Sequence, residues 1–200
     1  SGSAHKIVKI IMPVIERLLQ WGYTIKLRSD AGMNDPCLYE QCEHWGIEYV
    51  IRLKRNAVLL RKAEELLPLT GFDKRKQLTR YTTFEYAAES WNKKRTVYVK
   101  RVYHPNQLLP DYYFLVSSNS QTTAEQIFDF YDDRGTSENF IKEGKLDCGF
   151  TRLSCSDFWA NAFRFQIATL AYNIHNCFRE LVLPVPLKTH YLSTLRSKVI

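Results

Sequence analysis

The sequence has no long hydrophobic run, and no stretch approaches the roughly 18 apolar residues that a membrane-crossing helix needs. It also lacks a charged start followed by an apolar segment and a small-residue cleavage site, which is the pattern of a secretory signal. These two absences predict a soluble cytoplasmic protein with no membrane partner.

Cysteines are few and odd in number, and they are scattered along the chain. The five are Cys37, Cys42, Cys148, Cys155 and Cys177. Secreted disulfide frameworks use even numbers of cysteines in a compact pattern, so reduced thiols are the simpler interpretation. A zinc site is not indicated, because the spacing of Cys37, Cys42 and His44 matches no common zinc pattern and no second pair of ligands follows. No internal repeat or low-complexity tract is present.

The composition indicates one ordinary domain with a real core, large enough to carry an inserted subdomain. The chain has 200 residues, of which 45% are hydrophobic and 14% aromatic. Its formal net charge is +7 and its pI is about 9.1, values that favour an anionic partner such as nucleic acid without establishing one.

The first quarter of the chain alternates helical and strand patterns. Apolar periodicity predicts a helix over residues 6–20, and strand-forming residues predict strands over 23–28 and 48–53. Asp35 and Pro36 are typical of the start of a helix, which we expect to reach residue 45. Two strands joined through a helix imply parallel pairing, and Asp30 then follows the carboxyl end of the first strand.

The remaining elements are a β-rich middle and two long helices. A helix is predicted over residues 57–67. Three β-rich runs follow, over residues 78–88, 95–103 and 112–118. Thr122 or Thr123 can cap one helix that continues through Lys142. A closing helix is expected from about residue 156 to 183, where prolines stop it.

The most informative feature is the segment FYDDRGTSENFIKEGK. Its Tyr131, Arg134, Glu138 and Lys145 are separated by two, three and six residues. On one continuous helix, at roughly 100° per residue, these four side chains lie within about 60° of each other. A narrow stripe with a carboxylate, two cations and a phenol is suited to a metal ion and a phosphate backbone.

At this point the sequence resembles the DDE transposases of bacterial insertion sequences, in the branch with a tyrosine, arginine, glutamate, lysine signature. The segment IKLRSDAGMNDPCLYEQCEHWGIEYVIRLKRNAVLL resembles that family's second-aspartate strand with the helix and strand after it, and LSCSDFWANAFRFQIATLAYNI resembles its closing helix. The resemblance implies an α/β, RNase H-like fold: a partial core over 1–53, a basic, mostly β insertion over 54–120, the core signature and closing helices over 121–185, and a tail over 186–200.

The resemblance also implies a chemistry. Asp30 and Glu138 correspond to the second and third members of a carboxylate triad that binds two Mg²⁺ ions, with Mn²⁺ as a substitute, and catalyses phosphodiester cleavage and strand transfer. The expected substrate is double-stranded DNA, at element ends and at targets. Bringing two ends together favours a homodimer on DNA, nucleoid-associated in a bacterial cytoplasm.

Several further side chains are candidate DNA contacts. Tyr131, Arg134, Lys142 and Lys145 are suited to holding phosphates near the scissile bond. The alternative is a solvated helix face with local ion pairs. Trp91, in the insertion, is a weaker candidate for stacking on an unpaired base, against the alternative that it packs in the core.

The first member of the triad has no counterpart here, because the only acidic residue before Asp30 is Glu16, which lies inside the first helix. We therefore expect a fragment that is a poor catalyst alone and that has an unpaired sheet edge. Two alternatives remain: an inactive, truncated remnant that still binds DNA, and an unrelated basic interaction module.

Overall fold

The computed structural model describes residues 2–68, 75–105 and 107–199, and the chain forms two compact units, Ser1–Arg134 and Gly135–Ile200. Residues 69–74 and 106, which belong to the expected insertion, and the terminal residues 1 and 200 lie outside the described part. No helix in the described part is both long enough and apolar enough to cross a membrane.

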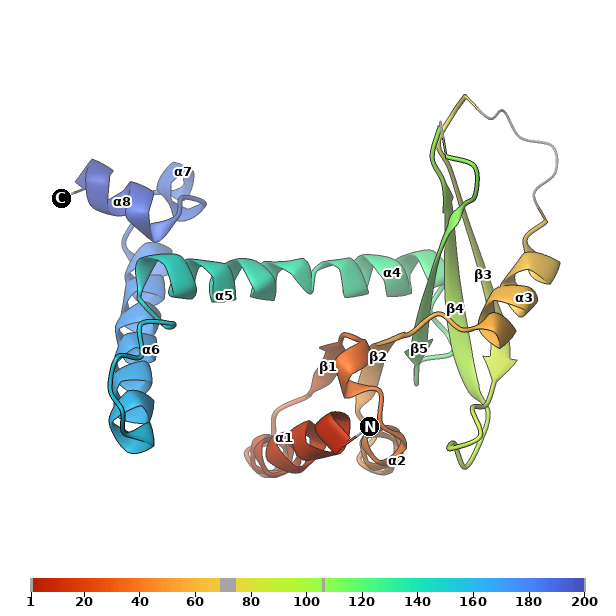
Figure 1. The fold of residues 1–200 in the computed structure, drawn as a ribbon, viewed down its shortest axis with the longest axis horizontal. Helices are drawn as coiled ribbons and strands as arrows, with labels where there is room; N and C mark the ends of the chain where they lie inside the picture. The colour runs from red at the N-terminus through yellow and green to blue at the C-terminus, as the bar shows by residue number, and fades with distance from the viewer. Residues whose placement is uncertain (1, 69–74, 106, 200) are drawn as a thin grey trace. The chain divides into compact units, whose positions relative to one another are not determined.

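The first unit is built on one mixed sheet of five strands (Figure 1). In chain order they are β1 (Lys26–Ser29), β2 (Glu48–Leu53), β3 (Leu78–Tyr86), β4 (Arg95–Tyr103) and β5 (Asp111–Ser117). Their order across the sheet is β1-β2-β5-β4-β3. The parallel pairing predicted for β1 and β2 is confirmed, and the other pairs are antiparallel. The three β-rich runs of the middle region thus continue the same sheet as β1 and β2.

Successive residues of the central strands are buried on opposite faces of this sheet. In β2, Tyr49 and Ile51 enter the larger core cluster, whereas Val50 enters the smaller one on the other side. Tyr98 of β4 and Leu115 of β5 join Val50, while their strand neighbours face the larger cluster. Because side chains alternate along a strand, this pattern requires cover on both faces.

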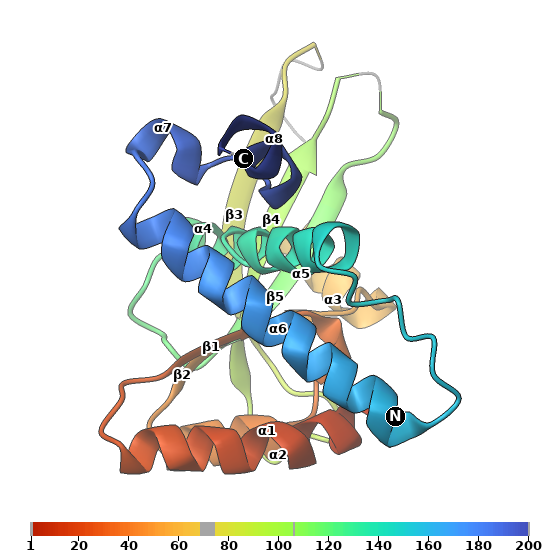
Figure 2. The ribbon, with the colours of Figure 1, turned by 90° about the vertical axis from the view of Figure 1, so that its left-hand side faces the viewer.

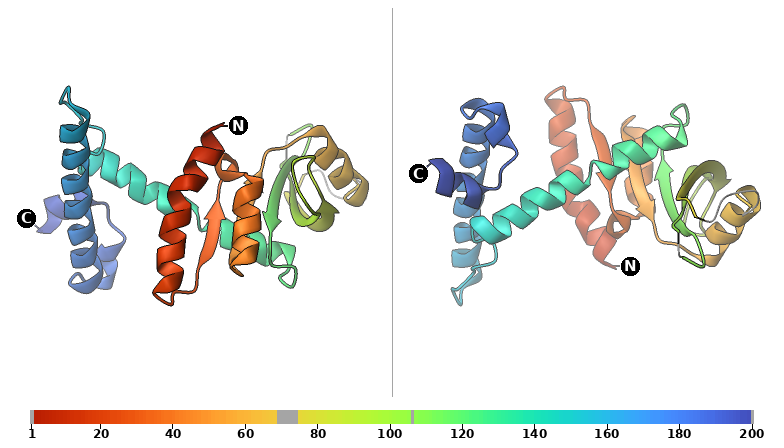
Figure 3. Two further views of the ribbon diagram at one scale, coloured as in Figure 1. Left: turned by 90° about the horizontal axis from the view of Figure 1, so that it is seen from below. Right: turned by 90° about the horizontal axis from the view of Figure 1, so that it is seen from above.

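The larger cluster is covered by the helices that precede and follow β2. They are α1 (Gly2–Gln20), α2 (Pro36–His44) and α3 (Ala57–Leu66). Figures 2 and 3 show α1 and α2 side by side across the sheet. Two of these helices start at side-chain caps: Asp35 accepts a hydrogen bond from the Cys37 amide at 2.9 Å, and Asn56 accepts one from the Leu59 amide at 2.8 Å.

The smaller cluster is covered by α4 (Ala124–Asp132), which packs on β3 and β4. Its start confirms the predicted Thr123 cap, because Thr123 and Gln126 form a reciprocal capping box. Ile127 and Phe128 are at most 4% exposed and lie against the sheet. This packing fixes the helix that leads into the tyrosine–arginine–glutamate–lysine segment.

The prediction of one continuous helix through Lys142 is wrong. The structure has two helices, α4 and α5 (Gly135–Asp147), and Asp133 and Arg134 lie between them in a turn. Glycine at position 135 is a poor residue for a helix interior, which is consistent with a break at this point. Lys145 is helical, because α5 continues to Asp147.

The second unit consists of α5, α6 (Phe158–Leu181), α7 (Val185–Lys188) and α8 (Leu192–Val199). The predicted closing helix is α6, whereas the two short helices of the tail were not predicted. A buried carboxylate joins these elements: Glu143 of α5 accepts hydrogen bonds from the Tyr172 hydroxyl at 2.6 Å, from Arg179 Nη1 at 3.1 Å and from the Leu192 amide at 2.6 Å. This one side chain therefore ties α5 to both α6 and α8.

The first unit has its own ion pair, between the half-buried Glu43 of α2 and the buried Arg95 of β4. Arg95 Nε donates to Glu43 Oε1 at 2.7 Å and Nη2 donates to Oε2 at 3.0 Å, a bidentate geometry. The arginine side chain is only 2% exposed. Burial tends to raise the pKa of Glu43, but hydrogen bonds from Arg95 and Lys93 outweigh it and hold that pKa below its ordinary value of 4.5.

Replacing Glu43 tests this pair. Glu43→Gln leaves the Arg95 charge buried and uncompensated, so we expect the free energy of unfolding at pH 7 to fall by about 3 kcal/mol. Urea denaturation measures it. Glu40→Gln, an exposed change on the same helix, is the control and should shift the value by less than about 0.5 kcal/mol.

The same pair predicts a pH dependence. Because the folded-state pKa of Glu43 is lowered, its stabilising contribution is present above pH 4.5 and is lost as the pH falls through the folded-state value. The stability difference between the wild type and Glu43→Gln should therefore shrink on acidification below pH 4.5. A difference that stays constant down to pH 3 would contradict this role.

Candidate functional site

Asp30 lies where the sequence places it, directly after the carboxyl end of β1. It is exposed and caps the short 3₁₀ helix η1 (Ala31–Met33), and its Oδ1 accepts a hydrogen bond from the Gly32 amide at 2.8 Å. In the described part of the chain its second carboxylate oxygen has no hydrogen-bond donor. One oxygen is thus oriented by the backbone, and the other is left to bind a ligand.

A cleft of about 460 Å³ adjoins Asp30. It is lined on one side by η1 and on the other by the end of β2 and the start of β5. Its cationic lining residues are Arg52, Lys54 and Arg55. One carboxylate next to three cations gives the cleft a net positive charge, which suits a phosphate backbone.

Arg28 links the strand that carries Asp30 to the end of α4. Its Nη1 donates a hydrogen bond to the Phe130 carbonyl at 2.7 Å and lies 3.7 Å from an Asp133 carboxylate oxygen. Its guanidinium also lies over the Phe130 ring, 5.1 Å from the centroid. A cation near the last carbonyls of a helix opposes the negative end of the helix dipole. Arg28 therefore fixes the last turn of α4 against the sheet.

Tyr131 and Arg134 lie together at this end of α4. The Tyr131 ring packs in the smaller core cluster and is 7% exposed, and its hydroxyl is buried with no hydrogen-bond partner among the described residues. The Arg134 guanidinium lies 5.6 Å from the centroid of that ring. In this structure Tyr131 therefore anchors the helix in the core and supports Arg134.

Glu138, Lys142 and Lys145 are exposed on α5, in the second unit. Asp30 and Glu138 thus belong to different units of the chain. Among the described residues, no three His, Cys, Asp or Glu side chains gather as a metal site. The donor chemistry of Asp30, a carboxylate with an unoccupied oxygen in an open cleft, is nevertheless of the kind that Mg²⁺ takes.

Trp91 is placed in the core. It is 9% exposed and makes edge-to-face contacts with the rings of Tyr39 and Tyr86, at 5.4 and 5.5 Å. The Arg95 guanidinium lies 5.4 Å from its centroid. This placement agrees with the core-packing alternative, since a ring enclosed in this way presents little surface for stacking on a base.

Sequence reasoning missed Arg28 and the cations around the cleft. A signal for Arg28 was present, because it is a cation in the predicted strand that leads directly to Asp30. The basic stretch after Leu53 was visible too, but its position beside Asp30 depends on the parallel register, in which Ser29 is opposite Ile51.

The fold is a mixed α/β domain with an acidic residue in a basic cleft at the end of parallel strands. A family described as transposase DDE domain group 1 matches residues 1–200, and the chain belongs to this family. Such transposases act on DNA and generally use divalent metals, typically Mg²⁺. No curated protein matches the chain.

Replacing Arg28 tests its link to α4. Arg28→Met keeps much of the aliphatic volume but removes the charge-assisted hydrogen bond to Phe130, so we expect a loss of about 2 kcal/mol in unfolding free energy. Amide hydrogen exchange in the variant should be faster than in the wild type, with the largest increase in the last turn of α4. Lys26→Met, on the same strand and side-chain exposed by 58%, is the control. Equal effects of the two changes would reject the link.

Proposed function

We propose that this chain supplies two of the three catalytic carboxylates, Asp30 and Glu138, of a DNA transposase that cuts and joins insertion-sequence ends. The observation that carries the proposal is Asp30: an oriented, exposed carboxylate at the carboxyl end of a parallel strand, in a cleft with three cations. Membership of the DDE transposase family supports the same reaction class.

Asp30 and Glu138 would hold the divalent ions, Mg²⁺ or Mn²⁺. Both are exposed carboxylates, and hard oxygen ligands with open positions suit these ions. When bound, such ions lower the pKa of an attacking water or hydroxyl and neutralise charge on the leaving oxygen. The hydrogen bond from the Gly32 amide restricts the orientation of the Asp30 carboxylate. This side chain therefore loses less conformational entropy when a metal binds.

The cations of the two units would hold the DNA backbone. Arg52 and Arg55 line the cleft beside Asp30, and a guanidinium can bind a phosphate through two parallel hydrogen bonds. Arg134, Lys142 and Lys145 follow along the signature segment, where phosphates next to the scissile bond are expected. Tyr131 and Trp91 would act through packing, by fixing the elements that carry charged residues.

The proposed arrangement is RNase H-like, with a third carboxylate on a neighbouring strand. β1 pairs with β2 alone in the described part of the sheet, so its other edge can accept a further strand. A carboxylate on that strand would lie near Asp30 and complete the triad. The absence of a three-carboxylate cluster in the described residues keeps one alternative, a remnant that binds DNA without cutting it.

Nicking of supercoiled plasmid or element-end DNA in Mg²⁺ or Mn²⁺, by a form of the protein that includes the proposed strand with the third carboxylate, tests the function. Asp30→Asn and Glu138→Gln should each lower the rate about 1,000-fold, because each removes a ligand from a centre that contributes several kcal/mol. Glu40→Gln is the matched control and should cut at the wild-type rate. Undiminished cutting by both site variants would reject the assignment, and DNA binding without any cutting by the wild type would favour the remnant.

A further inference from the structure

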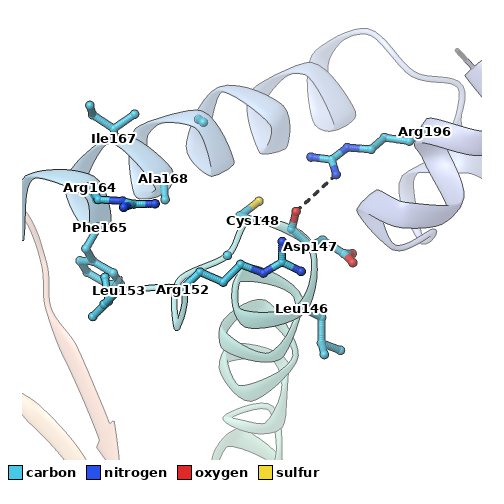
Figure 4. A pocket seen from close by; sticks show the side chains of 12 residues that line it. Leu146, Asp147, Cys148, Arg152, Leu153, Arg164, Phe165, Ile167, Ala168 and Arg196 are labelled. Atoms are coloured by element: carbon cyan, nitrogen blue, oxygen red, sulfur yellow. Dashed lines mark hydrogen bonds between the residues drawn. The ribbon is translucent and has the colours of Figure 1, made fainter. Parts of the chain in front are cut away.

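The second unit contains a pocket of about 600 Å³ (Figure 4). None of the four signature residues, Tyr131, Arg134, Glu138 and Lys145, lines it. It lies between the end of α5, the loop after it, α6 and α8. Three arginines line it: Arg152 from the loop, Arg164 from α6 and Arg196 from α8. All three are exposed, and Asp147 is the single acidic residue in the lining. We call this site the arginine pocket.

The arginines are not neutralised by the acid. The Asp147 carboxylate accepts a hydrogen bond from the Ser193 amide at 3.1 Å, and Arg196 Nη1 donates to the Asp147 carbonyl at 3.3 Å. Figure 4 shows Arg152 and Arg196 extended toward Asp147 from two sides. No arginine–carboxylate ion pair forms there among the described residues, and Arg152 makes no side-chain hydrogen bond. The pocket therefore keeps a net positive charge with unused donors.

The loop that carries Arg152 is held in place. Gly149 has a φ of +69°, which favours glycine, and the Arg152 amide donates to its carbonyl at 2.9 Å. Phe150 packs tightly over Gly144, where an added Cβ would lie 2.3 Å from the ring. The Phe150 ring also contacts the rings of Phe165 and Tyr172, at centroid distances of 5.2 and 5.8 Å. Arg152 thus projects from a fixed turn.

The Cys148 thiol, which also lines the pocket, is neutral. Burial raises the pKa of the Cys148 thiol, and this effect outweighs the lowering influence of Arg196. The thiol therefore stays protonated at neutral pH and adds no negative charge that would repel an anion.

We propose that the arginine pocket binds a backbone phosphate of DNA, at a site separate from the carboxylates. Arginines from three different elements line a space large enough for a phosphodiester. Arg164 donates a hydrogen bond to the Ser154 hydroxyl at 2.7 Å, whereas Arg152 has guanidinium donors without a partner among the described residues. The identification of the anion as DNA rests on the proposed function, but the presence of three arginines in one pocket is a property of this unit alone.

Salt-dependent DNA binding by the whole protein tests this site. Anisotropy of a fluorescent duplex of about 30 base pairs, in EDTA to remove metal, gives the affinity at several salt concentrations. Arg152→Gln should weaken binding and reduce the slope of log affinity against log salt by about 1, whereas Arg152→Lys should keep the slope. Arg17→Gln, which removes an exposed arginine from α1, should leave the slope unchanged.

An unchanged slope for Arg152→Gln, or an equal reduction for Arg17→Gln, would overturn the proposal. Competition by inorganic phosphate at constant ionic strength, together with an unchanged slope, would also overturn it and would identify a small-anion site. Because no cutting is measured, failure here is distinct from failure of the proposed function, which undiminished nicking by Asp30→Asn and Glu138→Gln would show.

Discussion

The burial of the central sheet on both faces is the constraint on which the first unit depends. β2 places Tyr49 and Ile51 in one core and Val50 in the other, so a shift of one residue would exchange the two sets. β1 is paired to this strand with Ser29 opposite Ile51. The register that satisfies the two cores therefore also sets where β1 ends, and it brings Asp30 to the cleft that Arg52 lines.

Each unit also contains a buried arginine that is paired with a carboxylate. Glu43 and Arg95 join α2 to β4, and Glu143 and Arg179 join α5 to α6. Desolvating such a pair costs much of its Coulomb attraction, so its net stabilisation is small, but an unpaired partner is strongly disfavoured. The main effect of each pair is therefore to disfavour alternative packings in which one of the two charges would be buried without the other. In the second unit the pair joins α5 to α6, and Glu143 also accepts a hydrogen bond from the Leu192 amide of α8, so this carboxylate fixes the three helices that line the arginine pocket.

Local patterns predicted much of this fold. Short apolar runs predict the bounds of β2 and β4, and a polar residue just before a helix predicts the cap at Thr123. These signals depend only on residues a few positions apart. The break at Asp133 and Arg134 was not predicted, because the spacing of Tyr131, Arg134 and Glu138 fits one face of a continuous helix. Tyr131 is in fact needed by the core beneath α4. The roles of Arg28 and Arg152 depend on contacts with distant segments, which no local pattern encodes.

Placing cationic sites on two units of one chain has a consequence for binding strength. If the cleft beside Asp30 and the arginine pocket each hold phosphates, DNA bound at one site presents further phosphates to the other at a high effective concentration. Modest contacts then combine into firm binding that weakens steeply with salt, since each neutralised phosphate adds to the release of counterions. Each arginine that is removed should accordingly lower the affinity by a further increment, while the carboxylates that we propose as catalytic would set only whether the bound strand is cut.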